Sequence, residues 1–258
     1  MKCISNLPML TAPTLPQAHR HGINALAATQ LQVDIAPYPG MDEGDLIELF
    51  WNDCFIASRC ITAGKVGTST RLRIPESFIQ SGAVRIHYQV MQVGHGPAQS
   101  AATCVQVKVD YPGGRPKALC NDENQNLAPV NLPEMIRRYG VNSRQVLRGV
   151  PLIIEPYLNM AADDEITLRW GDARLDLSPI QACDIAKPIQ VWVPSALIQE
   201  AGDDHRLEVT YCILDWVGNN SRWAPARTLR IAAAHPHPLI QTVSAYQPRR
   251  PGSPCEAG

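Results

Sequence analysis

Residues 35–53, IAPYPGMDEGDLIELFWND, are repeated 119 positions later by residues 154–172, IEPYLNMAADDEITLRWGD. The same register also matches Ile61 to Ile180 and continues to residue 80, so it holds over 46 positions. A repeat of this length indicates duplication of a structural unit, and the chain therefore contains two copies of one unit. The identical positions in the quoted stretch are Ile35/Ile154, Pro37/Pro156, Tyr38/Tyr157, Met41/Met160, Asp45/Asp164, Ile47/Ile166, Leu49/Leu168, Trp51/Trp170 and Asp53/Asp172.

Length and composition bound what these units can be. The 258 residues divide into two units of roughly 100 residues, a size that buries its own core. A formal net charge of −1 gives no electrostatic case for binding nucleic acid or an anionic membrane. The 22 prolines and 18% charged residues favour a β-rich chain with many turns.

The beginning of the chain lacks the features of a secretory leader. In MKCISNLPMLTAPTLP, Pro8 and Pro13 interrupt any apolar segment. No stretch approaches the roughly 20 apolar residues of a membrane-spanning helix. We expect a protein with no transmembrane segment that is cytoplasmic or exported by a non-Sec route, and the sequence does not decide between these.

The eight cysteines do not follow the repeat. Cys54, Cys60 and Cys183 align with Ala173, Pro179 and Gly64, respectively. A disulfide belonging to the unit would occur in both copies, so we predict mostly free thiols in a reducing compartment. A Cys54–Cys60 bridge across a hairpin is the alternative.

Alternation of apolar and polar residues predicts short strands separated by turn signals. Pro75 opens a single predicted helical turn over residues 75–82. About seven short segments per 100 residues are typical of a two-sheet antiparallel sandwich. The predicted strands are 31–35, 45–51, 71–74, 84–90 and 104–109 in the first copy, and 150–155, 165–170, 189–193, 207–213 and 228–232 in the second.

The sequence thus predicts an all-β fold of two tandem Ig-like antiparallel β-sandwich domains. Trp51 and Trp170 occupy the place of the core tryptophan on the third strand, and Tyr88 and Tyr211 have the spacing of a tyrosine corner. The predicted core aromatics are Tyr38, Trp51, Tyr88, Tyr157, Trp170 and Tyr211. The predicted divisions are an N-terminal arm (1–22), domain 1 (23–110), a linker (111–131), domain 2 (132–233) and a Pro-rich tail (234–258).

These motifs resemble the bacterial Ig-like repeats that occur in tandem in Pseudomonas and related proteobacterial proteins. The shared elements are the I-x-P-Y-x-x-M-x-x-x-D lead-in, the I-x-L-x-W strand and the later Tyr-containing strand. They cover about residues 31–109 and 150–232. The resemblance implies the Ig-like fold and a surface or interaction role, without a known ligand.

No catalytic motif is recognisable, so we predict a protein that is not an enzyme and has no cofactor or metal. The pairs His19/His21 and His235/His237 lie in the arm and the tail without further ligands. The acidic turns around Asp45 and Asp164 have two interpretations. They either hold Ca²⁺ or bond their own backbone locally.

The best binding candidates lie where the copies differ. Trp216 and Trp223 have no Trp counterpart in the first copy and flank the loop VGNNSR. We predict a loop patch made of Trp216, Asn219, Asn220 and Trp223. The leading hypothesis is a non-enzymatic, adhesion-type module that binds another protein. The alternatives are binding of a carbohydrate or cell-surface glycan, and a structural accessory of a larger secretion or toxin assembly.

Overall fold

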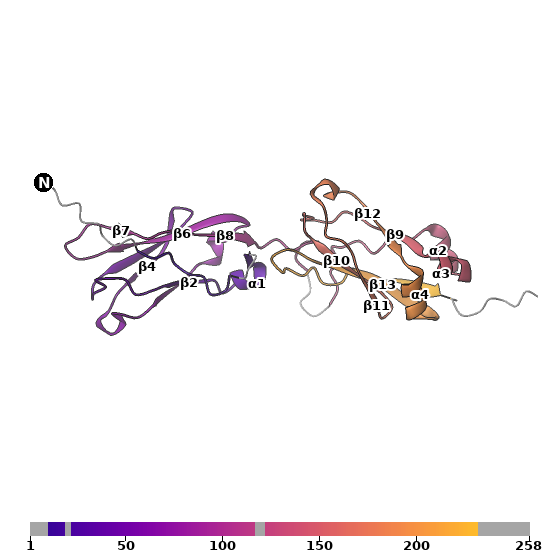
Figure 1. Ribbon diagram of the computed structural model, residues 1–258, viewed down its shortest axis with the longest axis horizontal. Coiled ribbons are helices and arrows are strands. Elements are labelled where there is room, and N and C mark those ends of the chain that lie inside the picture. The colour runs from indigo at the N-terminus through magenta and orange to yellow at the C-terminus, as the bar shows by residue number, and fades with distance from the viewer. Residues whose placement is uncertain (1–9, 19–21, 117–121, 232–258) are drawn as a thin grey trace, which may run out of the picture.

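The computed structural model describes residues 10–18, 22–116 and 122–231, which form two β-sheet domains arranged end to end (Figure 1). The predicted tail, 234–258, and all four histidines of the arm and the tail lie outside these residues. Within the described part of the chain, no helix is long and apolar enough to cross a membrane.

The first domain contains two sheets. The larger has the strand order β1-β8-β6-β3-β4, with β7 also pairing with β6, and the smaller pairs β2 with β5. The strands are β1 Ile23–Asn24, β2 Gln32–Ile35, β3 Leu46–Trp51, β4 Cys54–Cys60, β5 Thr70–Arg73, β6 Gly82–Met91, β7 Ala98–Gln99 and β8 Thr103–Lys108. The helical turns are α1 Ala25–Ala28, η1 Ala63–Lys65 and η2 Glu76–Phe78, the last within the predicted turn at 75–82.

The second domain repeats this topology. Its order β11-β10-β13-β14 corresponds to β4-β3-β6-β8, and its β12-β9 pair corresponds to β5-β2. The strands are β9 Val150–Ile154, β10 Glu165–Trp170, β11 Ala173–Asp176, β12 Ile189–Val193, β13 Asp204–Leu214 and β14 Arg227–Ile231. The helices are α2 Glu134–Tyr139, α3 Ser143–Arg148, η3 Ala182–Asp184 and α4 Ser195–Ala201. The predicted all-β architecture of two tandem Ig-like sandwiches is confirmed.

Strict alternation explains why the central strands form where they do. Along β3, Ile47, Leu49 and Trp51 are buried while the residues between them are half-exposed, and β10 repeats the pattern. Neighbouring residues of a strand point to opposite faces, so one face enters the core and the other meets solvent. Each fully buried aliphatic or aromatic side chain contributes about 1.5–3 kcal/mol relative to an exposed one.

Each domain has its own core, and the predicted core aromatics lie in these cores. Tyr38, Trp51 and Tyr88 are buried in the first, Trp170 and Tyr211 in the second, and Tyr157 packs against the second with partial exposure. The cores also take in residues outside the predicted domain boundaries. These are Leu10 and Leu15 of the predicted arm, and Leu127 and Val130 of the predicted linker.

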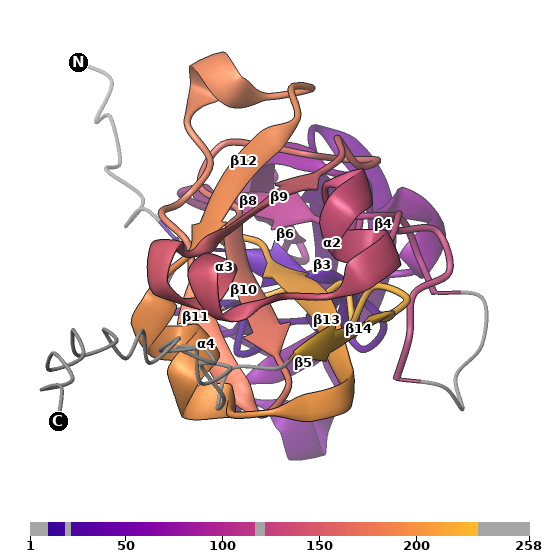
Figure 2. The same cartoon turned by 90° about the vertical axis from the view of Figure 1, so that its right-hand side faces the viewer.

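A glycine at the start of each unit allows the backbone to approach the last strand closely. Gly22 and Gly140 both have positive φ, and a Cβ on either would overlap a carbonyl oxygen, of Gln106 and Arg230 respectively. Only glycine combines this conformation with such close approach. Both glycines lead into a helix capped by an asparagine, at α1 and α3. Figure 2 shows α2 and α3 across the far end of the second domain.

Candidate functional site

The repeated stretch forms the same turn in both domains, and a buried carboxylate holds it together. The Tyr38 hydroxyl donates a hydrogen bond to Asp45 (2.8 Å), as the Tyr157 hydroxyl does to Asp164 (2.9 Å). In each turn the same carboxylate oxygen also accepts a hydrogen bond from a backbone N–H three positions earlier. The donors are Asp42 in the first domain (3.1 Å) and Ala161 in the second (3.0 Å). The aspartates therefore bond their own turns, as the second interpretation of these residues expected.

Burial changes the protonation chemistry of these turns. It raises the pKa of the Tyr38 and Tyr157 hydroxyls well above the usual range, and the neighbouring carboxylates raise it further. The tyrosines are therefore neutral hydrogen-bond donors at physiological pH. Within the described residues, no group of three or more His, Cys, Asp or Glu side chains could hold a metal ion.

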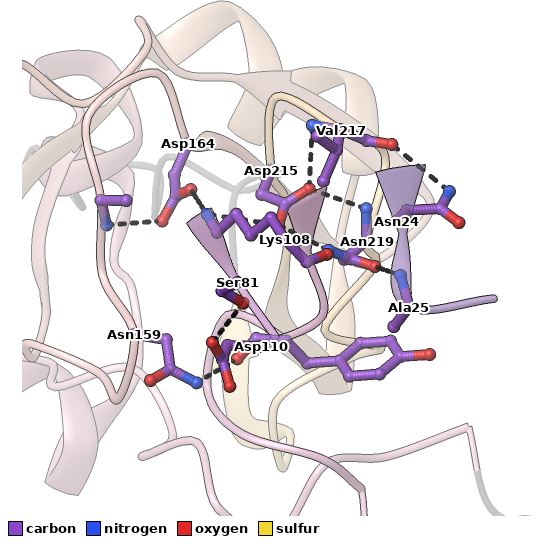
Figure 3. A network of polar contacts seen from close by, with 12 residues as sticks. Asn24, Ala25, Ser81, Lys108, Asp110, Asn159, Asp164, Asp215, Val217 and Asn219 are labelled. Carbon is purple, nitrogen blue, oxygen red and sulfur yellow. Dashed lines mark hydrogen bonds and ion pairs between the residues drawn. The ribbon is translucent and has the colours of Figure 1, made fainter. Parts of the chain in front are cut away.

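In the second domain the turn also receives a lysine from the first domain. Lys108, the last residue of β8, places its Nζ 3.5 Å from Asp164 Oδ1 and 3.2 Å from Asp215 Oδ2 (Figure 3). Both carboxylates are fully buried and the lysine side chain is 12% exposed. Buried ions need a partner of opposite charge, because they have lost their hydration. The two domains thus share one buried ionic cluster.

Asn219 connects the two domains with its side-chain amide. Its Nδ2 donates to the carbonyl of Lys108 (2.8 Å) and to Asp215 (2.9 Å), while its Oδ1 accepts the N–H of Ala25 (2.8 Å). The side chain thereby ties together β8, the start of α1 and the loop after β13 (Figure 3). Every described hydrogen bond of this amide lies in the junction.

Further hydrogen bonds surround this centre. Asn24 donates to the carbonyl of Val217 (3.3 Å), and Asn159 donates to that of Tyr111 (2.9 Å). The backbone N–H of Gly113 donates to the carbonyl oxygen of Leu158 (2.7 Å). These contacts come from segments far apart in the sequence, so the junction is a tertiary interface as well as a covalent connection.

Electrostatically, the cluster combines two carboxylates with one ammonium group. Burial raises the pKa of Asp164, against the opposing effects of the backbone N–H of Ala161, the Tyr157 hydroxyl and Lys108. The arrangement presents no nucleophile paired with a base. Its chemical capacity is to fix the orientation of two domains.

The predicted loop patch is divided by this junction. Asn219 is only 3% exposed and belongs to the interface, so its side chain does not join an exposed patch. Asn220 is exposed, and Trp216 and Trp223 are half-exposed. The Trp223 ring lies 5.0 Å from the guanidinium carbon of Arg169, in a cation–π contact.

Trp216 and Trp223 lie at different positions along the length of β13. The residue after Trp223 bonds Tyr211 in the middle of β13, whereas Trp216 lies beyond Leu214, where that strand ends. The two positions, at Tyr211 and beyond Leu214, are at least three strand residues or roughly 10 Å apart. Trp216 lies beside the junction, and Trp223 lies beside residues 122–124.

The Cys54–Cys60 bridge, considered as an alternative, is excluded by the fold. Both residues lie at the ends of one strand, β4, and six strand residues span roughly 20 Å. A disulfide requires Cα atoms within about 7 Å. Cys54, Cys60, Cys104, Cys183 and Cys212 are free thiols.

Sequence reasoning missed Lys108, Asp215 and Asn24 as members of the junction. One signal was present in the copies themselves: the position of Asp215 after its strand corresponds to Gln92 in the first domain. Gln92 donates to Asp45 (3.3 Å) and to the carbonyl of Gly40 (2.7 Å). The first domain thus has the amide of Gln92 where the second domain has the carboxylate of Asp215, which binds Lys108.

The sequence matches no protein-family model. It also matches no curated protein. Solved structures show a distant likeness. A bacterial 1.5-MDa ice-binding adhesin is 12% identical, with 86% of this chain and 64% of that chain covered and a TM-score of 0.35. The chain thus spans less than two thirds of that structure.

Two further solved structures are similar at the same level. Fibronectin(III)-like modules of Clostridium thermocellum CbhA are 9% identical over 85% of this chain and 93% of theirs, with a TM-score of 0.38. A tetra-tandem repeat from the extending region of a large adhesion protein is 10% identical over 84% and 48%, with a TM-score of 0.32.

Proposed function

We propose that this protein is a non-enzymatic, adhesion-type interaction module of the Pseudomonas-type Ig-like repeat class, which presents two rigidly connected domains to another protein. The observation that carries the proposal is the junction, where Lys108 lies between the buried Asp164 and Asp215. A flexible pair of domains would not need to bury an ionic cluster between them. Fixed orientation reduces the entropy lost when a partner contacts both domains at once.

The remaining exposed part of the loop patch is the first surface to test. Trp216 and Asn220 keep exposed atoms beside the junction, whereas Trp223 does so roughly 10 Å away along the hairpin. Neither tryptophan has a Trp counterpart in the first domain. Aromatic residues at such positions supply large contact area at low entropic cost. A partner that contacts this surface would also lie near the end of the first domain.

The experiment is a pull-down from the native cell with the full chain as bait. We expect a specific protein partner whose recovery falls for the double variant W216A/W223A, with an unchanged thermal transition. The matched control is the core variant W170A, which should unfold the second domain. Binding to an array of glycans, lost on the same double substitution, would replace the protein partner with a cell-surface glycan. Absence of any partner would contradict the proposal.

A further inference from the structure

The outer face of the two-stranded sheet changes character between the two domains. In the first domain, Arg71 bonds Asp34 in a bidentate ion pair, with distances of 2.6 and 2.7 Å. The repeat places Gln190 and Ile153 at these positions in the second domain. The flanking pair Gln32 and Arg73 is likewise replaced by Pro151 and Trp192. A charged face has thus become largely apolar.

Trp192 is exposed and yet held in place. The residue is 57% exposed, and it lies directly opposite Pro151 in the ladder between β9 and β12. Opposed residues of antiparallel strands project from the same face, so the two side chains adjoin. Gly149 has a φ of +87°, and a Cβ there would overlap the indole Nε1. The glycine therefore allows the ring to lie against the backbone.

A pocket begins at the same proline. It has a volume of about 370 Å³ and lies between β9 and the segment that leads into α2. Its apolar lining comprises Leu132, Pro133, Pro151, Leu152 and Ile153. Trp192 and the pocket are therefore neighbours on one surface, with Pro151 common to both. A volume of this size accepts one or two large side chains.

Arg137 supplies an unpaired positive charge at this pocket. Glu134, which also lines it, is engaged by Arg138 at 2.5 Å. The Arg137 guanidinium is exposed and has no ion-pair partner among the described residues. A guanidinium in this position favours a carboxylate, which it can bind through two parallel hydrogen bonds.

We propose that the surface of Trp192, Pro151 and this pocket binds an extended segment of another protein, with an apolar side chain in the pocket and an adjacent carboxylate on Arg137. The inference rests on the proposed function and names the chemistry of the partner. The pocket favours a peptide over a sugar, because its apolar lining would leave sugar hydroxyls without partners. It also favours a peptide over a membrane, because it is concave.

The test is a selection of random 12-residue peptides displayed on phage against the full chain. We expect enriched peptides to carry an aromatic or large aliphatic residue next to Asp or Glu. Binding of synthetic versions, measured by fluorescence anisotropy, should weaken about tenfold or more for Trp192→Ala. Arg137→Glu should weaken it similarly and favour peptides in which Lys replaces the acidic residue. Arg73→Ala, the equivalent position in the first domain, should leave binding unchanged.

Other outcomes overturn this inference and separate it from the proposed function. If no peptide of this class is enriched, or if Trp192→Ala binds as the wild type does, the site is wrong. If the native partner is lost with W216A/W223A but retained with Trp192→Ala, the interaction function stands without this surface. If a glycan array shows binding that Trp192→Ala abolishes, the surface binds sugar. Thermal unfolding of each variant confirms that its fold is intact.

Discussion

At the scale of single residues, Asn219 joins the two domains through hydrogen bonds of its side-chain amide. It lies in the loop where the two copies differ, and its side chain is buried in the junction. Its partners, the N–H of Ala25 and the carbonyl of Lys108, lie 194 and 111 residues away in the chain. No local pattern can reveal a hydrogen bond that depends on how two domains meet.

The first prediction concerns this asparagine. Asn219→Ala should lower the free energy of unfolding, because each buried polar group left unpaired costs about 1–3 kcal/mol. Asn220→Ala, the exposed neighbour, should lower it by less, about 0.5–1 kcal/mol, because it removes only one exposed hydrogen bond, from the N–H of Arg222 (2.7 Å). Urea denaturation of the full chain measures both. Equal effects of the two substitutions would contradict the assigned role of Asn219.

The second prediction concerns two aspartates with opposite pKa shifts. Burial raises the pKa of Asp164, so between 3.8 and that raised pKa the native state binds more protons than the unfolded chain. The contribution of Asp164 to stability should therefore fall as pH rises through this window. A hydrogen bond from Arg71 lowers the pKa of Asp34, whose contribution is present above 3.8 and lost as pH falls through the lowered pKa.

Carboxyl ¹³C NMR titration distinguishes these two groups directly. The Asp164 midpoint should lie above 3.8 and the Asp34 midpoint below it. Asp164→Asn should remove the corresponding pH dependence of unfolding, whereas Asp34→Asn should remove the acid-side loss. Coincident midpoints would show that Asp164 is solvated in solution and that the junction is open.

At the scale of elements, strands with a buried face are predictable from the sequence, whereas β4 and β11 are not. β3 and β10 are predictable because one face of each enters a core, so apolar and polar residues alternate along them. β4 has no buried residue, and β11 buries only its first, so neither has an alternation to detect. Helix α2 is not predicted by the sequence pattern, because its six residues are too few to show a helical period.

Tyr211 has the sequence spacing of a tyrosine corner, but its hydroxyl makes a long-range hydrogen bond instead of the local one that this motif predicts. Tyr211 is buried in the core, but its hydroxyl donates to the carbonyl of Ala128, 83 residues earlier (2.8 Å). A tyrosine corner bonds the backbone only a few residues upstream. Here the bond instead fixes the segment that enters the second domain, a relation invisible to short-range spacing.

The third prediction compares two helix-ending glycines. Gly140 and Gly202 end α2 and α4 with φ of +79° and +73°. Gly140→Ala should cost about 2–6 kcal/mol, because φ of +79° with ψ of −169° is a backbone region essentially restricted to glycine and the new Cβ must also displace the backbone of Arg230. Gly202→Ala should cost only the backbone part, about 1–3 kcal/mol, since its ψ of −168° gives the same conformation but a Cβ there meets nothing within 4 Å. Thermal unfolding measures both.

Comparable losses for these two alanine variants would contradict the close approach of α2 to β14. The pair is a matched test, because both glycines follow a short helix and differ mainly in what surrounds them.

At the scale of the whole molecule, the repeat predicted two units but not their fixed relation. Residues 111–131 have the composition of a linker, rich in Pro, Gly and Asn. In the structure, Gly113 bonds the second domain and Leu127 enters its core. Composition predicts a connection without regular structure, but it does not tell whether that connection packs against its neighbours.

The fourth prediction tests the rigidity of the molecule. Lys108→Met leaves two buried carboxylates without their cation, and removing one partner of a buried ion pair costs about 3–5 kcal/mol. We expect the two domains of this variant to tumble independently while each sandwich stays folded. ¹⁵N relaxation should then give a different rotational correlation time for each domain. Lys65→Met, at an exposed site in the first domain, is the control. Joint tumbling of both domains in Lys108→Met would contradict the role of this lysine.

The position of Lys108 at the end of β8 has a mechanical consequence. The chain leaves the first domain at this residue, so tension applied along the long axis of the molecule reaches the junction (Figure 1). A few side-chain bonds carry the load there, whereas each sandwich distributes it over complete strand ladders. Under a steady pull, the junction should yield first and lengthen the molecule slightly before any strand detaches. A module built in this way would be rigid without load and would extend slightly under tension, by opening of its junction.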